Sequence, residues 1–150
     1  MILIAHRGNI SGPRPDLENS IPYIEDAISQ GFQVEIDLRM KDGELYLGHD
    51  EPQYPVSEEF LDRYKSYLWV HCKDHESFRA MVRERSMNFF WHDTDDYVLT
   101  RYGYVWAYPG KPPIGQLCVM VMPELHWSID DIKQMNTFGV CSDYVRLLNT

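Results

Sequence analysis

Four side chains in the first fifty residues are of types that carry out metal-assisted acid–base chemistry. His6 follows a short apolar run at residues 2–5, and His49 lies just beyond a later apolar stretch. Between them, Glu35 and Asp37 alternate with apolar residues, so a strand of period two places both carboxylates on one face. Imidazoles transfer protons near neutral pH, and clustered carboxylates bind divalent cations. We therefore predict that these four side chains share one site.

The segments around these residues must bring them together. The opening of the chain has the pattern strand, helix, strand, which predicts parallel pairing and a right-handed crossover. Only residues 40–44 separate the second strand, expected at 32–38, from the next strand-like run at 45–47. That is too short for a parallel crossover, so we predict an antiparallel hairpin instead. Its returning arm would carry His49 back beside the two carboxylates.

The rest of the chain continues to alternate between strand-like and helix-like segments, which is typical of an α/β domain. A length of 150 residues favours a single domain over residues 1–150. Composition changes nowhere sharply, and no internal repeat is present. Further strands are expected at residues 68–73, 88–92, 104–108, 117–122 and 139–143, and further helices at about 57–64, 74–82 and 128–135.

Composition and charge exclude several classes of function. Hydrophobic residues make up 44% of the chain, as in ordinary globular proteins, and the formal net charge is -9. This charge argues against nucleic acid or an anionic membrane surface as the main partner. No apolar run approaches the roughly 20 residues of a transmembrane segment. Three widely spaced cysteines and the absence of a visible targeting segment lead us to expect reduced thiols and a cytoplasmic location.

Five short motifs follow one another within residues 6–50: His6-Arg7-Gly8, Glu18-Asn19-Ser20, Glu35-Ile36-Asp37, Lys41-Asp42-Gly43 and His49-Asp50. In order and spacing they resemble the glycerophosphodiester phosphodiesterase family, within the wider group of phospholipase-C-like phosphodiesterases. The resemblance covers the first third of the chain well and becomes weaker afterwards. It implies a reduced TIM-type (β/α) barrel with about seven parallel strands and a β-hairpin extension after strand two. Some helices would be missing on one side of this barrel.

The resemblance also implies roles for the first motifs. His6 and His49 look like the family's paired acid–base histidines, although which is acid and which is base stays open. Glu35 and Asp37 look like metal ligands, and Arg7 matches an arginine that contacts a phosphate oxygen. Oxygen ligands of this kind favour Mg²⁺ or Ca²⁺.

The sequence departs from the family pattern at the third strand. The family usually presents Glu-x-Lys there, and this chain has His71-Cys72-Lys73. His71 would replace the third metal ligand, and an imidazole also suits Mn²⁺ or Zn²⁺. Lys73 shares the face of His71 and would contact phosphate, whereas Cys72 should face away from the site. Loss or weakening of the metal site is the alternative.

Other residues are candidates for the pocket wall. His92, Trp106 and Tyr108 lie at expected carboxyl ends of strands, the end where sites of β/α barrels lie, although Trp106 is equally suited to the core. Asn19 is a further candidate; either Asn19 or Ser20 is expected to cap the first helix, and for Asn19 we expect this role rather than chemistry. Arg39 continues the parity of the two carboxylates, and the alternative to a metal is that it neutralises one of them.

The function predicted from these features is metal-dependent hydrolysis of a glycerophosphodiester or similar small phosphodiester by paired-histidine catalysis, which would make the chain a phosphoric diester hydrolase. One alternative is a phospholipase-like phosphodiesterase that acts on lipid head groups. Another is a non-catalytic module that binds phosphate ligands after losing the full metal site. An incomplete barrel exposes strand edges, so a homodimer is also a prediction.

Overall fold

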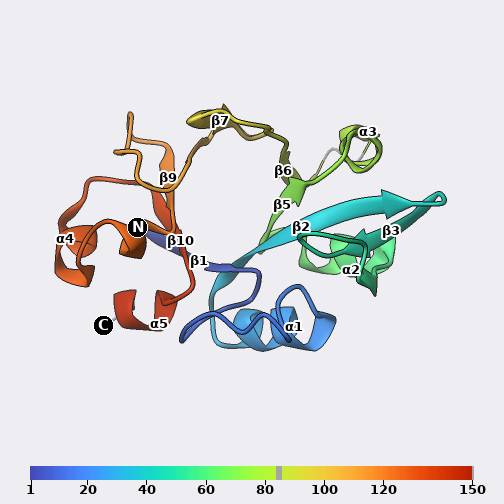
Figure 1. Cartoon of the computed structure of the whole chain (residues 1–150), viewed down its shortest axis with the longest axis horizontal. Helices are drawn as coiled ribbons and strands as arrows, with labels where there is room; N and C mark the ends of the chain where they lie inside the picture. The colour runs from blue at the N-terminus through green and yellow to red at the C-terminus, as the bar shows by residue number, and fades with distance from the viewer. Residues whose placement is uncertain (84–85, 150) are drawn as a thin grey trace.

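The computed structural model describes residues 1–83 and 86–149. In these residues ten strands form one sheet that curls into a half-barrel, with most helices around its outside (Figure 1). The strands are β1 (Ile2–His6), β2 (Gln33–Lys41), β3 (Glu44–Leu47), β4 (Tyr54–Pro55), β5 (Leu68–Cys72), β6 (Asn88–Phe90), β7 (Tyr97–Leu99), β8 (Val105–Ala107), β9 (Cys118–Val121) and β10 (Gly139–Ser142). The helices are α1 (Ile21–Ser29), α2 (Glu58–Tyr64), α3 (His75–Arg83), the 3₁₀ turn η1 (Pro123–Leu125), α4 (Ile129–Gln134) and α5 (Val145–Leu148).

Parallel pairing dominates the sheet. Strands β6, β5, β2, β1, β10, β9 and β8 lie side by side in this order, and each neighbouring pair is parallel. These are the seven parallel strands expected from the sequence, and their existence is confirmed. The pairing of β1 with β10 joins the two ends of the chain, so the first and last strands are neighbours near the centre of the sheet.

The predicted hairpin is also present. The first residues of β2 pair with β1, and from Leu38 onward β2 pairs with β3 in antiparallel register. The turn between them contains Asp42 and Gly43, both with positive φ. Because β3 begins to pair only beyond the end of β1, the hairpin extends past the carboxyl edge of the parallel strands. Its returning arm therefore ends beside that edge.

Two apolar layers stabilise the sheet. Val34, Ile36 and Leu38 belong to an outer cluster that includes residues from α1, α2 and α3. Side chains of opposite parity fill the inside of the curl, and this inner cluster contains Ile4, Trp69, Phe90, Trp106, Val119 and Cys141. Cys72 lies in the outer cluster, as its parity predicted.

The helices are short, and polar residues begin three of them. Side-chain oxygens of Ser57, Asp74 and Ser128 accept hydrogen bonds from backbone N–H groups three residues further on, as expected for N-caps. No helix forms between residues 86 and 122, so the strands from β6 to β9 have no helical connections. Across the described parts of the chain, no helix combines the length and apolar composition needed to cross a lipid bilayer.

The sheet stays open between β6 and β8. Residues 97–99, not expected to be a strand, form β7, which pairs with β8 in antiparallel register. Within residues 1–83 and 86–149, no strand pairing joins β6 to β7 or β8. A hydrogen bond from Arg101 N–H to the Phe89 carbonyl, 2.8 Å long, links the two sides. The architecture shown is a curled half-barrel of mostly parallel strands with few helices.

Candidate active site

Four predicted site residues, and Asp143, share one structural origin. Each lies two positions beyond a residue of the inner apolar cluster, at or just past the end of its strand. Alternation along the strand therefore turns its side chain into the curl, on the carboxyl side of the apolar layer. The pairs are Ile4 and His6, Trp69 and His71, Phe90 and His92, Trp106 and Tyr108, and Cys141 and Asp143.

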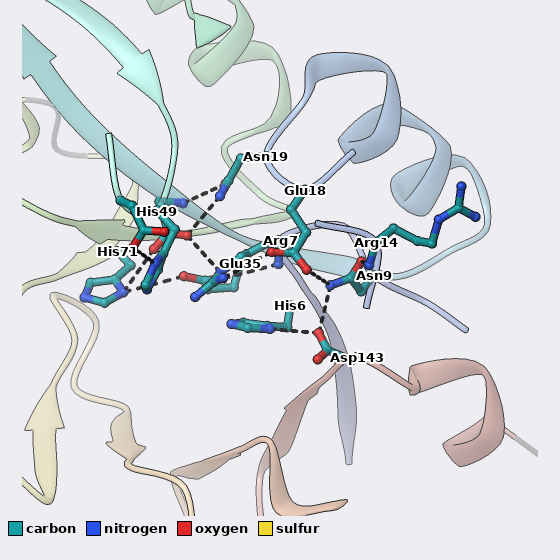
Figure 2. Close-up of polar contacts among 12 residues, drawn as sticks. His6, Arg7, Asn9, Arg14, Glu18, Asn19, Glu35, His49, His71 and Asp143 are labelled. Carbon is teal, nitrogen blue, oxygen red and sulfur yellow. Dashed lines mark hydrogen bonds and ion pairs between the residues drawn. The ribbon is translucent and has the colours of Figure 1, made fainter. Parts of the chain in front are cut away.

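Glu35, Asp37 and His71 form the central cluster. One potential ligand atom from each residue lies within 4.8 Å of the others. His71 Nδ1 is 3.7 Å from Glu35 Oε1 and 3.5 Å from Asp37 Oδ1. The strand register accounts for this arrangement, because Asp37 and His71 are direct partners in the β2–β5 pair. Figure 2 shows His71 and Glu35 turned toward each other.

The two carboxylate oxygens of Asp37 differ: Oδ2 has polar partners, and Oδ1 has no hydrogen-bond partner among the described residues. Asn19 donates from Nδ2 to Asp37 Oδ2 over 2.9 Å, and its Oδ1 accepts the Asp37 backbone N–H. Arg7 Nε lies 3.0 Å from the same carboxylate oxygen. The second oxygen, Oδ1, is buried and has no hydrogen-bond partner, with His71 Nδ1 and Lys73 Nζ at 3.5 and 3.7 Å. A buried, unpartnered carboxylate oxygen is costly unless a cation approaches it.

This donor set could hold a divalent cation. Two carboxylates and one imidazole converge, and the unpartnered Asp37 Oδ1 faces the other two donors. The carboxylates suit Mg²⁺ or Ca²⁺, and the imidazole widens the choice to Mn²⁺ or Zn²⁺. The geometry is thus compatible with the ligand set predicted from the sequence.

Burial of the site does not neutralise Glu35. Burial by itself raises the pKa of a carboxylic acid, and Glu35 is almost completely enclosed. His71, His6 and Arg7 outweigh that effect and lower the pKa of Glu35 to about 2. Glu35 is therefore ionised at neutral pH and available to a cation.

Arg7 links the cluster to the loop that follows β1. Its backbone has φ of 53°, in the left-handed region that non-glycine residues seldom occupy. Its guanidinium Nη1 donates to Glu18 Oε2 over 3.1 Å while Nε faces Asp37. Glu18 Oε1 also accepts from Asn9, so the loop, the arginine and β2 are joined. Strain of this kind persists where surrounding contacts compensate for it.

His6 is paired with Asp143 across the β1–β10 junction. Its Nδ1 lies 2.8 Å from Asp143 Oδ1, which also accepts from Asn9 Nδ2 over 2.9 Å (Figure 2). Burial lowers the pKa of His6, but the hydrogen bond to Asp143 and the charge of Glu35 outweigh it, so the pKa is raised. Because Nδ1 is engaged, the imidazole can offer Nε2 for proton transfer.

His49 lies at the end of the hairpin. Arg39 donates hydrogen bonds to the carbonyls of Gly48, at 3.0 Å, and of His49. The alternative that Arg39 neutralises a carboxylate of the site is therefore wrong, because its guanidinium turns to the returning arm of the hairpin. His49 Nδ1 lies 2.8 Å from Asp50 Oδ1, and this pair is much more exposed than His6 and Asp143.

One cavity of about 320 Å³ contains nearly all the predicted site residues. His92 stacks on His71 with ring centroids 4.6 Å apart, and Tyr108 meets His92 edge-on at 6.5 Å. Trp106 lines the cavity and also packs on Phe90, so both of its predicted roles are compatible with its position. The predicted residues in the cavity wall are His6, Arg7, Glu35, Asp37, His49, His71, Lys73, His92, Trp106 and Tyr108.

Asn19 differs from its expected role. It lies in the wall of an adjoining cavity, and the N-cap of α1 is Ser20, which makes no side-chain cap hydrogen bond. The amide of Asn19 is instead used by Asp37. Sequence reasoning gave no role at the site to Asp143, Asn9 or Glu18, although Glu18 belongs to one of the five motifs. The parity of β10 was the available signal for Asp143, two residues beyond the buried Cys141.

Comparison with protein-family models, with curated proteins and with solved structures found no match to this chain. The resemblance to a family therefore depends on the motifs in residues 6–50 alone.

Proposed function

We propose that this chain is a metal-dependent phosphodiesterase that hydrolyses a glycerophosphodiester or a similar small phosphodiester on a reduced TIM-type barrel. The observation that carries the proposal is convergence. His6 from β1, Glu35 and Asp37 from β2, His71 from β5 and His49 from the loop after β3 line one cavity. An enzyme of this class needs proton donors and acceptors beside an electrophilic phosphoryl group, and the cavity wall contains both kinds of group.

Each residue has a role suited to its surroundings. Arg7 and Lys73 place positive charge in the wall of an otherwise acidic protein and would bind phosphate oxygens. His6, with Nδ1 directed at Asp143, would transfer a proton through Nε2, and His49 would serve as the second proton-transfer group. A bound divalent cation would polarise the phosphoryl group as a Lewis acid.

The direct test is hydrolysis of glycerophosphocholine and bis(p-nitrophenyl) phosphate with Mg²⁺, Ca²⁺ or Mn²⁺. We expect metal-dependent release of product, and a loss of about a hundredfold or more in His6→Ala, as for removal of a general acid–base group. His126→Ala is the matched control, because His126 is exposed and lies in neither cavity wall around the site. Equal activity of His6→Ala and the control would exclude this mechanism.

One feature favours a second candidate, a non-catalytic module that binds phosphate ligands. Arg7 and Lys73 already place cationic groups 3.0 and 3.7 Å from Asp37, and His71 Nδ1 lies 3.5 Å from it. If these groups satisfy the carboxylates by themselves, no metal is required for burial. Calorimetry separates the two functions: binding of inorganic phosphate without binding of Mg²⁺, Ca²⁺ or Mn²⁺ would favour the module. Metal binding that is lost in His71→Ala would favour the enzyme.

A further inference from the structure

Two cavities meet at the candidate active site. The first, of about 320 Å³, contains the Glu35–Asp37–His71 cluster, and the second, of about 610 Å³, lies on the side of the β1 loop and η1. Four lining residues belong to both cavities: His6, Arg7, His49 and Met122. Both proposed proton-transfer groups therefore lie where the cavities meet. Because these four residues border both cavities, we refer to the two cavities together as the groove and to the four shared residues as its waist.

Charge is distributed unevenly along this groove. Among the described lining residues, Arg7 at the waist and Lys73 in the first cavity are the only arginine or lysine side chains. The first cavity has four carboxylates in its wall and the second has five. Near the centre, Glu18 pairs with Arg7, and Asp37 pairs with Arg7 and Lys73. The positive side chains of the groove thus lie at its centre, beside carboxylates, whereas the described residues at its ends include carboxylates without arginine or lysine.

The carboxylates at the two ends of the groove have no such cationic partners in the part of the chain that the structure describes. Asp93 and Asp95 line the far part of the first cavity, and Glu51 and Glu124 line the second. None of these four carboxylates makes an ion pair with a described residue. Glu124 Oε1 accepts the Asp143 backbone N–H, while its Oε2 is buried without a hydrogen-bond partner. An anionic group placed at either end would meet repulsion without a nearby counter-charge.

The centre of the groove independently indicates a ligand. Asp37 is 1% exposed, and its Oδ1 is unpartnered in the wall of the first cavity. A cation is the natural partner for that oxygen, and Lys73 and Arg7 provide further positive charge within 4 Å of the same carboxylate. An anion is therefore best placed between the waist and this cluster.

The walls of the two ends also differ in kind. Trp106, Tyr108, Val98 and Pro109 give the first cavity an aromatic and apolar wall, and Tyr108 is half exposed. Seven of the fifteen residues that line the second cavity are carboxylates or amides, including Gln53, and these groups accept hydrogen bonds from hydroxyl or ammonium donors.

From these observations we infer that the groove binds a phosphodiester across its waist, with the phosphate between Arg7 and Lys73, one organic arm in each cavity, and neither arm negatively charged. The inference rests on the proposed function and narrows its substrate class. By this inference the groove does not bind phosphomonoesters that carry a second anionic group. It also does not bind phosphodiesters that have a carboxylate or phosphate on one of their two arms. Neutral hydroxylated arms and cationic arms are accepted.

Binding of phosphinates tests the inference separately from catalysis, because carbon–phosphorus bonds join both arms and hydrolysis cannot occur. Each probe has one 3-hydroxypropyl arm, and the other arm is propyl, 3-(trimethylammonio)propyl or 2-carboxyethyl. Calorimetry in the presence of Mg²⁺ should give a dissociation constant at least about tenfold higher for the carboxyethyl probe than for the propyl probe, equivalent to about 1.4 kcal/mol. The trimethylammonio probe should bind at least as tightly as the propyl probe.

Charge-reversal variants test whether carboxylates of the groove cause the weaker binding of the carboxyethyl probe. Glu51→Lys and Asp95→Lys change exposed residues, one in each cavity, and at least one of them should reduce the discrimination against the carboxyethyl probe. Glu44→Lys is the matched control: it makes the same charge change at an exposed residue of the hairpin, outside both cavities. The control should retain the discrimination.

Equal affinity for the propyl and carboxyethyl probes would overturn the inference, as would failure of all three probes to bind. An equal effect of all three lysine variants would also overturn it, because the discrimination would then come from net charge. Hydrolysis of bis(p-nitrophenyl) phosphate, measured on the same protein, reports on the proposed function. Hydrolysis without discrimination refutes the inference alone, and discrimination without hydrolysis refutes the proposed catalysis alone.

Discussion

Substitution of Asp143 by asparagine is the sharpest test of how the fold controls His6. Asp143 Oδ1 accepts hydrogen bonds from His6 Nδ1 at 2.8 Å and from Asn9 Nδ2 at 2.9 Å. The side chains of His6 and Asp143 are only 11% and 7% exposed. Asparagine keeps the size and one accepting oxygen of aspartate but removes its charge. The variant therefore changes the electrostatics of the pair with little change in packing.

The expected magnitude follows from the type of hydrogen bond. A hydrogen bond to a charged group contributes roughly 1.5–3 kcal/mol to stability, and a neutral one roughly 0.5–1.5 kcal/mol. Asp143→Asn should therefore lower the free energy of unfolding by about 1–2 kcal/mol when His6 is protonated. In the native protein, burial lowers the pKa of His6 and Asp143 raises it, with a raised pKa as the result. Without the charge, the pKa of His6 should fall.

The sign of the pH dependence is fixed by this shift. A histidine whose pKa is raised by folding contributes stability that is fully present below the unfolded pKa, near 6.5. That contribution is lost as the pH rises through the folded pKa. The difference in unfolding free energy between native protein and Asp143→Asn should therefore be larger at about pH 5.5 than at about pH 8.5.

Urea unfolding at both pH values, with an NMR titration of the His6 ring, measures these quantities. Asp50→Asn is the control, because it alters the exposed His49–Asp50 pair and should leave the unfolding free energy unchanged. An unchanged pKa of His6 in Asp143→Asn would refute the reasoning. So would a stability loss of the same size at both pH values, since it would then come from packing.

Two further substitutions test the loops that support the site. Asn19→Ala removes the two hydrogen bonds to Asp37 and should lower the unfolding free energy by about 2–4 kcal/mol, measured by urea unfolding. It should also weaken Mg²⁺ or Mn²⁺ binding in calorimetry, and unchanged metal affinity would separate Asn19 from the cluster. Gly48→Ala would place a Cβ 2.0 Å from the Glu51 carbonyl oxygen, so the loop that carries His49 must shift and diester hydrolysis should fall. Gly43→Ala also has positive φ but open space around its Cβ, so it should retain activity while losing about 1–2 kcal/mol of stability.

The sequence alone was sufficient for features that depend on local periodicity and chain length. Alternation along residues 34–38 placed Glu35 and Asp37 on one face, and the same rule separated His71 and Lys73 from Cys72. The few residues between β2 and β3 required a hairpin, which the structure contains. These features were predictable because side-chain direction in a strand has a period of two, and short connections permit few geometries.

The tertiary structure decided which side chains became partners. Asp143 meets His6 across 137 positions because β10 pairs with β1, and Asn19 turns from the expected helix cap to Asp37. In the described residues β6 does not pair with β7 or β8, and Arg39 binds the Gly48 carbonyl of the hairpin arm instead of a site carboxylate. Periodicity sets the face that a side chain occupies, but it does not specify the neighbouring strand or the competing hydrogen bonds. Those depend on how distant segments pack together, and that information lies outside any local window of the sequence.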